Sequence, residues 1–215
     1  MHVISIVGII SSWSTLVIPA LLLVLRPQRM AKANWALLAF CLLQFIMDRL
    51  HEFADLRGIE HPLNFIFVVL EYCSLAALMY LSLQKKRNRR WLFAGSMLFF
   101  VLSGLTWLRL GADHYSSIRG ISAILLISYA MFFFMEWITA ETFAPINARA
   151  EFWMVTGTLL YLAGNFFFFI TMRHHFTEGL LIHYLVNMLR NGCFVAAMLQ
   201  SWSLVRTRLM SANKY

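Results

Sequence analysis

A glutamate and an arginine occur deep within two apolar segments of the sequence. Glu71 lies about ten residues into the segment 62–83, and Arg190 about twelve residues into the segment 179–204. At a rise of about 1.5 Å per residue, both are predicted near the middle of a lipid bilayer. An ionisable side chain there costs several kcal/mol unless it is paired or hydrated. Since a lone buried charge costs more than a matched pair, we expect Glu71 and Arg190 to form an ion pair or to hold a ligand together.

Other polar residues share helix faces with these two. On the segment 179–204, His183, Asn187 and Arg190 or Asn191 follow the i, i+4, i+7 or i+8 spacing of one helix face. The candidate ligand-binding residues are Glu71, Tyr161, Asn165, His183, Asn187, Arg190 and Asn191. Because lipid-facing positions should be apolar, we expect these residues to line a polar interior. The alternative is that they only join helices, by hydrogen bonds of about 0.6 kcal/mol each.

A second polar stripe lies on the segment 34–54, where acidic residues and a histidine follow Gln44. The candidate metal ligands are Asp48, His51, Glu52, Asp55 and His183. Carboxylate and imidazole groups are common zinc ligands, and imidazole also titrates near neutral pH. The stripe therefore indicates either a zinc site or a proton sensor. The sequence contains no HExxH motif to support the metal interpretation.

The polar residues are embedded in a chain whose composition is typical of membrane proteins. It is 60% hydrophobic and 13% charged, whereas soluble domains average about 45–50% and about 25%. A membrane-spanning helix needs about 20 mainly apolar residues. Such segments occur at 3–25, 34–54, 62–83, 91–109, 117–139, 151–172 and 179–204. The sequence therefore predicts an all-α fold, with one domain of seven transmembrane helices over residues 1–215.

The basic residues predict how this domain lies in the membrane. Twelve of the 18 lysine and arginine residues lie in the first, third and fifth linkers and the C-terminal tail. Only Arg57, Arg109, Arg119 and Arg173 lie on the opposite side. Because cytoplasmic linkers are rich in Lys and Arg, we expect the N-terminus outside and the C-terminus in the cytoplasm, in a bacterial inner membrane. The net charge of +8 thus reflects topology and contact with the lipid bilayer, and not a nucleic-acid partner.

Two further observations concern the spans. All four lysines, Lys32, Lys85, Lys86 and Lys214, lie in linkers or the tail, so no span offers the lysine that retinal requires. Gly157 and Gly164 are spaced i, i+7, which favours close packing of the segment 151–172 against another helix.

Two strings resemble small bacterial seven-helix membrane proteins that are similar to the membrane sensing modules of histidine kinases. The strings are EFWMVTGTLLYLAGNFFFFI at 151–170 and NMLRNGCFVAAML at 187–199. The resemblance covers about 33 residues and implies a sensory or regulatory role. It supplies no catalytic residues. The sequence ends about ten residues after its last predicted span, so we expect any signal to pass to a separate protein.

The sequence thus predicts a receptor-like or regulatory module that binds a small ligand, lipid or proton in a polar cavity open to the outer side. Its partner would be a cytoplasmic or membrane signalling protein. Three alternatives remain: an intramembrane lipid hydrolase that uses a metal such as zinc, a small-solute transporter or channel, and a structural subunit. Bound zinc would indicate the hydrolase, and proton-coupled uptake the transporter.

Overall fold

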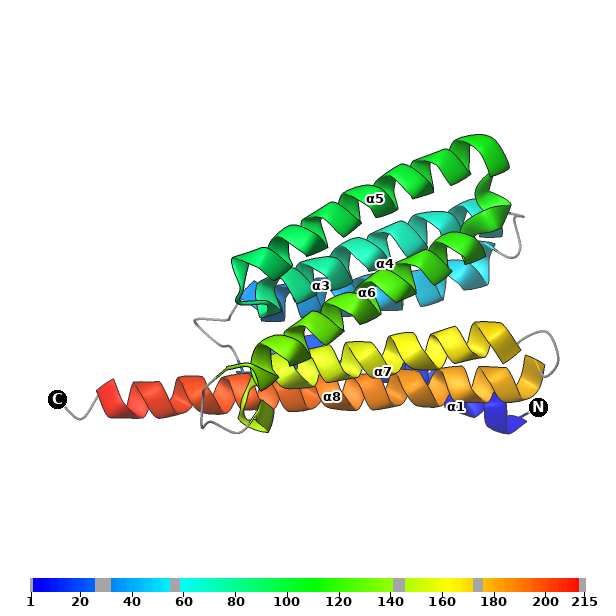
Figure 1. Cartoon of the computed structure of the whole chain (residues 1–215). Coiled ribbons are helices and arrows are strands. Elements are labelled where there is room, and N and C mark those ends of the chain that lie inside the picture. Colours follow the sequence, from blue (N-terminus) through cyan, green and yellow to red (C-terminus); the bar gives the residue numbers. More distant parts are fainter. Residues whose placement is uncertain (1, 26–31, 55–58, 141–145, 172–175, 213–215) are drawn as a thin grey trace.

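The computed structural model describes residues 2–25, 32–54, 59–140, 146–171 and 176–212, whose arrangement is shown in Figure 1. Within these ranges the fold is helical throughout and contains no β-strand. The α-helices are α1 (His2–Ser14), α2 (Val17–Leu25), α3 (Lys32–Ala54), α4 (Glu60–Ser82), α5 (Lys86–Leu110), α6 (Tyr115–Ile138), α7 (Ala150–Thr171) and α8 (Phe176–Ala212). The predicted all-α fold class is therefore confirmed.

Five helical segments are long and apolar enough to cross a membrane. They are Lys32–Leu50, Glu60–Ser82, Lys86–Leu110, Ala112–Ile138 and Gly179–Ser203. Their outward faces are apolar: on α5, Trp91, Phe93 and Leu108 are exposed. These features indicate a multi-pass membrane protein. Helices also occupy the two other predicted span ranges, while the count of seven spans and their orientation stay predictions.

The predicted first span is divided into two helices, where the sequence led us to expect one. At the break, the N–H groups of Thr15 and Leu16 bond to carbonyls three residues earlier, at 3.3 and 3.0 Å. Pro19 explains the position of this break. A proline ring clashes with the carbonyl four residues earlier in a helix, which here belongs to Thr15.

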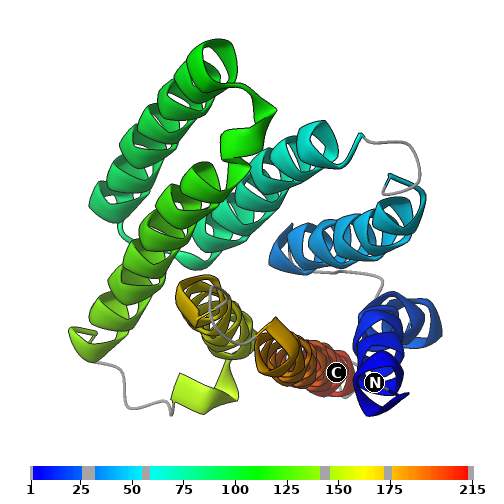
Figure 2. The same cartoon turned by 90° about the vertical axis from the view of Figure 1, so that its right-hand side faces the viewer.

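The helices enclose the middle of the bundle without α5. In a view along the bundle, α1, α3, α4, α6, α7 and α8 surround its centre, and α5 lies outside against α4 and α6 (Figure 2). The most extensive contact joins α7 and α8. A Cβ atom added at Gly157 would lie 2.8 Å from the Cβ of Cys193, and one at Gly164 would collide with Val186. The prediction that these glycines permit close helix packing is confirmed.

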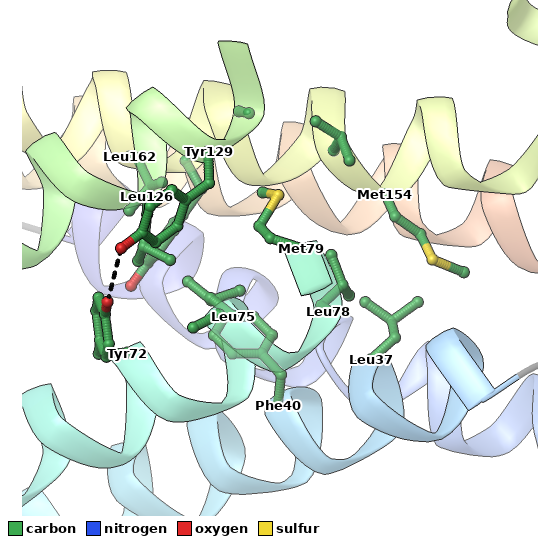
Figure 3. Packing of buried hydrophobic residues seen from close by; sticks show 14 of the residues in the cluster. Leu37, Phe40, Tyr72, Leu75, Leu78, Met79, Leu126, Tyr129, Met154 and Leu162 are labelled. Carbon is green, nitrogen blue, oxygen red and sulfur yellow. Dashed lines mark hydrogen bonds between the residues drawn. The ribbon is translucent and has the colours of Figure 1, made fainter. Parts of the chain in front are cut away.

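Apolar side chains fill the half of the bundle that contains the start of α3 and the end of α4. Part of this packing is shown in Figure 3, and it includes Leu37, Phe40, Leu75, Leu78, Met79 and Met154. Along α4 these residues follow Glu71, and along α7 Met154 precedes Tyr161. The apolar core therefore lies on one side of the predicted polar residues and leaves the other half of the bundle for them.

A small hydrogen-bonded cluster attaches α5 to this core. The Tyr72 hydroxyl lies 2.9 Å from Ser96 Oγ and 3.2 Å from the Tyr129 hydroxyl, the second of these contacts being drawn in Figure 3. Tyr129 in turn donates to the Leu92 carbonyl at 3.2 Å. A Cβ atom added at Gly95 would collide with the Tyr129 hydroxyl, so this glycine makes room for the cluster.

The turn between α4 and α5 is held by a buried carboxylate that the sequence did not single out. Glu136, near the end of α6, accepts hydrogen bonds from the backbone N–H groups of Gln84 and Lys85 at 2.7 and 3.0 Å. It also accepts one from Asn88 Nδ2 at 2.8 Å. A carboxylate at a helix N-terminus compensates N–H groups that have no partner within the helix. Glu136 therefore caps α5 from a neighbouring helix.

Candidate ligand-binding cavity

A cavity of about 640 Å³ lies between α1, α3, α4, α6, α7 and α8, in the half of the bundle where α3 ends and α8 begins. This half is on the right of Figure 1, and its end faces the viewer in Figure 2. The polar lining residues are Ser11, Ser12, Gln44, Asp48, Arg49, Asn64, Glu71, Ser116, Arg119, Ser122, Tyr161, Asn165, His183, Tyr184 and Asn187. Ligand pockets measure about 300–1,000 Å³, so the cavity is large enough for a small molecule.

Most of the predicted ligand-binding residues meet at this cavity. Glu71, Tyr161, Asn165, His183 and Asn187 line it, and they come from α4, α7 and α8. The other two, Arg190 and Asn191, are buried behind its wall. Helical spacing in the sequence identified the polar residues that share a face of one helix. The structure shows that these faces of α4, α7 and α8 line the same cavity.

Glu71 and Tyr161 connect two of these walls. Both side chains are buried, and the Glu71 carboxylate accepts a hydrogen bond from the Tyr161 hydroxyl. Asn64 lies two turns before Glu71 on the same face of α4 and also lines the cavity. The carboxylate is therefore held by α7 while it faces the cavity.

The direct ion pair expected between Glu71 and Arg190 is not formed in the structure. The Arg190 side chain is fully buried, and its Nε and Nη2 atoms both donate to Asn191 Oδ1, at 3.1 and 3.0 Å. Its guanidinium carbon lies 4.5 Å from the centre of the Tyr161 ring and 5.1 Å from that of Phe40. Tyr161 thus stands between the two charges. Aromatic faces attract a cation electrostatically, and this attraction replaces the expected carboxylate contact.

Asn191 links Arg190 to the first two helices. Its Nδ2 atom donates to Ser14 Oγ at 2.7 Å and to Thr15 Oγ1 at 3.3 Å, at the break between α1 and α2. The sequence suggested Asn191 as a ligand-binding residue, and the structure places it between the cavity wall and this break. Its two amide atoms bind different neighbours, so it couples α8 to the end of α1.

His183 lies between two asparagines on the cavity wall. Its Nδ1 atom is 2.6 Å from Asn165 Oδ1, and its Nε2 atom is 3.1 Å from Asn187 Nδ2. A neutral imidazole that donates through Nδ1 and accepts through Nε2 satisfies both contacts. The hydrogen bond between His183 and Asn187 confirms that they share one face of α8.

Asp48 joins α3 to α1 at the opposite wall. Its Oδ1 atom accepts from Gln44 Nε2, and its Oδ2 atom accepts from Ser12 Oγ, both at 3.1 Å. Arg49 Nη2 also donates to Ser12 Oγ, at 3.1 Å. Both carboxylate oxygens of Asp48 are therefore engaged by neighbouring side chains.

Arg119 lines the cavity from α6, whereas its place in the sequence predicted only a basic residue on the outer side of the membrane. Its guanidinium carbon lies 5.8 Å from the Phe67 ring and 5.7 Å from the Tyr115 ring. Its position inside the predicted span 117–139 was the signal that could have identified it.

Two fully buried amide oxygens on residues that line the cavity have no hydrogen-bond partner among the described residues. They are Gln44 Oε1 and Asn187 Oδ1, and each side chain is only 7% exposed. The orientation of Gln44 is fixed, because its Nε2 atom faces the acidic oxygen of Asp48. Buried polar groups are normally paired, and the buried donor Arg190 Nη1 likewise has no partner among the described residues.

The predicted metal site is described only in part. Asp48 and His183 both line the cavity, whereas Asp55 and the side chains of His51 and Glu52 lie outside the described residues. Among the side chains that are described, no group of three His, Cys, Asp or Glu residues could hold a metal ion. The zinc site stays a prediction.

No protein-family model matches the chain, and no curated protein or solved structure is significantly similar to it.

Proposed function

We propose that this chain is a receptor-like membrane protein that binds a small ligand in the cavity and passes a signal to a separate partner protein. The proposal places it in a bacterial inner membrane. The cavity would face the outer side, and the basic linkers would face the cytoplasm.

The cavity itself is the observation that carries this proposal. Two carboxylates and two arginines line it within a bundle whose outward faces are apolar. Ionisable groups within membrane bundles are costly, and they commonly mark ligand or ion sites. We propose the sensory class also on the sequence resemblance of the segments 151–170 and 187–199, and both segments contribute cavity residues.

The apolar core favours ligand binding over conduction. Leu75, Leu78 and Met79 are buried on α4 beyond Glu71, and Phe194 is buried on α8 beyond Arg190. Their packing closes the inner end of the cavity in this conformation. A ligand that enters from the other end would therefore stop at Glu71 and Tyr161.

The contacts behind the cavity suggest how occupancy would be transmitted. The Tyr161 hydroxyl donates to Glu71, and the Arg190 guanidinium lies over the face of the Tyr161 ring. Asn191 holds Arg190 on one side and the break between α1 and α2 on the other. A ligand that binds Glu71 would compete with Tyr161 and so alter the support of Arg190. Such a shift needs differential binding of only a few kcal/mol between the two arrangements.

Native mass spectrometry and elemental analysis of the gently purified full chain would test the proposal. We expect a co-purifying small molecule that is lost in Glu71→Gln and Asn187→Leu. A matched variant, Gln200→Met, removes a side-chain amide that instead donates to Ala148 at the other end of α8 and should retain it. Stoichiometric zinc would indicate the hydrolase. An empty protein, or occupancy that no cavity variant changes, would contradict ligand binding here.

A further inference from the structure

Helices α6 and α7 touch at one end of the bundle and separate towards the other. At the touching end, the rings of Phe134 and Phe152 lie 6.2 Å apart in an edge-to-face contact. From there the two helices diverge towards the end of the bundle that contains the cavity (Figure 1). We call the part of the cavity between them the α6–α7 groove. It is lined by Ser116, Gly120 and Ala123 of α6 and by Leu162 and Phe166 of α7.

Small side chains on α6 make this groove wide. Ser116, Gly120 and Ala123 follow the i, i+4, i+7 spacing of one helix face. A Cβ atom added at Gly120 would have no neighbour within 4 Å, although packed helices normally leave few voids. On the other side, Leu162 and Phe166 are one turn apart on α7 and present apolar side chains. The groove therefore has open space and a largely apolar wall.

The groove opens sideways from the bundle. Among the described residues that line the cavity, Ser116, Phe166 and Ile9 are the exposed ones, and the first two lie on opposite sides of the groove. The apolar helical segment Ala112–Ile138 begins four residues before Ser116 and eight before Gly120, so the groove lies about 6–12 Å inside this segment. The groove therefore connects the cavity with the hydrocarbon region of a bilayer.

The other neighbouring helices around the cavity are joined to one another. Helix α3 packs along α4. The remaining pairs share a hydrogen bond, a ring contact or a close approach: Ser12 with Asp48 between α1 and α3, Gly8 with Tyr184 between α1 and α8, Asn165 with His183 between α7 and α8, and Arg119 with Phe67 between α6 and α4. A long molecule in the cavity would therefore extend out of the bundle through the α6–α7 groove.

The polar wall next to the groove can both accept and donate hydrogen bonds. The Tyr161 hydroxyl donates to Glu71 Oε1, which leaves the lone pairs of Oε2 for another donor. Asn165 lies one turn from Tyr161 on the same face of α7, and its Oδ1 atom contacts His183. Its Nδ2 atom then remains as a donor on a half-buried side chain that lines the cavity. A ligand group with both a donor and an acceptor matches this wall.

The route through the groove also restricts the charge of the ligand. Ionised groups are strongly disfavoured in hydrocarbon, so a molecule that enters from the bilayer interior should carry an uncharged polar group. A hydroxyl group is uncharged and has one donor together with acceptor lone pairs. An ether or a ketone only accepts, and it would offer Glu71 no donor. A hydroxyl group therefore fits both the route and the polar wall.

We infer that the cavity binds a long-chain lipid alcohol from the bilayer, with its hydroxyl group at Glu71 and Asn165 and its chain in the α6–α7 groove. This inference rests on the proposed function, because it names the ligand class of the same cavity and the side from which it enters. The hydrocarbon chain would lie against Gly120, Leu162 and Phe166 and extend between the two helices into the lipid.

Two glycines offer a matched test of the groove with hexadecanol as the probe. Native mass spectra of the full chain released from nanodiscs that contain hexadecanol would measure its retention. In Gly120→Leu the new side chain enters the groove, where its Cβ atom meets nothing within 4 Å. We expect at least about tenfold lower retention, because the lipid chain would have to overpack this space. Gly104→Leu places the same side chain in open space on α5 and should retain hexadecanol.

The hydroxyl group is tested without any substitution by comparing hexadecanol with hexadecyl methyl ether, which lacks the O–H donor. Hydrogen bonds to charged groups are strong enough that we expect the unaltered chain to prefer the alcohol by about tenfold or more. In Glu71→Met this preference should fall towards one. The variant Gln200→Met removes an amide at the other end of α8 and should keep the preference.

Three outcomes would overturn the inference. They are equal retention of hexadecanol by Gly120→Leu and the unaltered chain, equal retention of the alcohol and the ether by the unaltered chain, and no retention of either molecule. If another molecule nevertheless occupies the cavity and is lost in Glu71→Gln, the proposed function stands without this inference. If no molecule occupies the cavity in any preparation, both fail.

Discussion

The Arg190 guanidinium lies 4.5 Å from the centre of the Tyr161 ring, and the hydroxyl of that same ring donates to Glu71. A single tyrosine therefore connects a buried cation and a buried carboxylate that do not touch. Its ring contributes a cation–π contact, worth about 2 kcal/mol when desolvated, and its hydroxyl contributes a hydrogen bond. This arrangement predicts how substitutions at the three positions should combine.

Glu71→Met and Tyr161→Phe should be strongly non-additive, because both remove the same hydrogen bond. We expect a coupling free energy of about 1.5–3 kcal/mol in a double-mutant cycle, the usual range for hydrogen bonds to charged groups. Glu71→Met and Arg190→Met should couple less strongly, since Tyr161 separates the two side chains. The unfolding free energy in detergent is the measurement. A larger coupling for Glu71 with Arg190 than with Tyr161 would indicate the direct ion pair.

Glu136→Gln should destabilise the end of the bundle that contains the α4–α5 turn. The carboxylate accepts from two backbone N–H groups and from Asn88, and glutamine would present an NH₂ group to some of these donors. We expect a loss of about 1.5–3 kcal/mol of unfolding free energy, measured by thermal unfolding in detergent. Glu151→Gln, in the first turn of α7, is the matched control and should cost below about 1 kcal/mol. Equal effects of the two variants would contradict the capping role.

Two glycines of α5 should respond to alanine in opposite directions. In Gly95→Ala the new methyl group would collide with the Tyr129 hydroxyl, so we expect destabilisation by about 1–3 kcal/mol. A Cβ atom at Gly104 has no neighbour within 4 Å, and alanine is the better helix former by about 0.5–1 kcal/mol. Gly104→Ala should therefore be neutral or stabilising. Comparison of the two unfolding temperatures tests whether the Tyr72–Ser96–Tyr129 cluster positions α5.

The orientation predicted from the basic residues can be tested by labelling single cysteines with a membrane-impermeant maleimide. Ser117, at the start of α6, and Arg87, at the start of α5, are both exposed and lie at opposite ends of the bundle. In a variant whose native cysteines are replaced by alanine, Ser117→Cys should react in intact bacterial cells. Arg87→Cys should react only after permeabilisation. The reverse pattern would show that the cavity faces the cytoplasm.

The sequence predicted the helices and several site residues because both depend on local patterns. Segment length and hydropathy located the helical ranges, and the spacing of His183 and Asn187 placed both on one face of α8. Pro19 carried the signal for the break in the first predicted span, although segment length alone suggested one helix. The prediction of one continuous helix over 3–25 was wrong, because hydropathy does not record that proline lacks a backbone N–H group.

The pairing of charges could not be predicted in the same way. Glu71 and Arg190 were matched because they lie at the same depth, but depth leaves the rotation of each helix about its axis open. In the structure that rotation places Tyr161 between them and brings Arg119 to the cavity. Such partners depend on which helices are neighbours, and the sequence of a single chain contains no local pattern for this.

The length of α8 has a mechanical consequence. It contains 37 residues, so at about 1.5 Å per residue it is roughly 55 Å long, whereas the hydrocarbon core of a bilayer is about 30 Å thick. His183 and Asn187 form part of the cavity wall near one end, and the other end extends beyond the rest of the bundle (Figure 1). One continuous helix therefore lines the cavity at one end and protrudes from the bundle at the other. From the contact of Cys193 with α7, the helix continues for about 28 Å, so a tilt of about 5° displaces its protruding tip by roughly 2.5 Å.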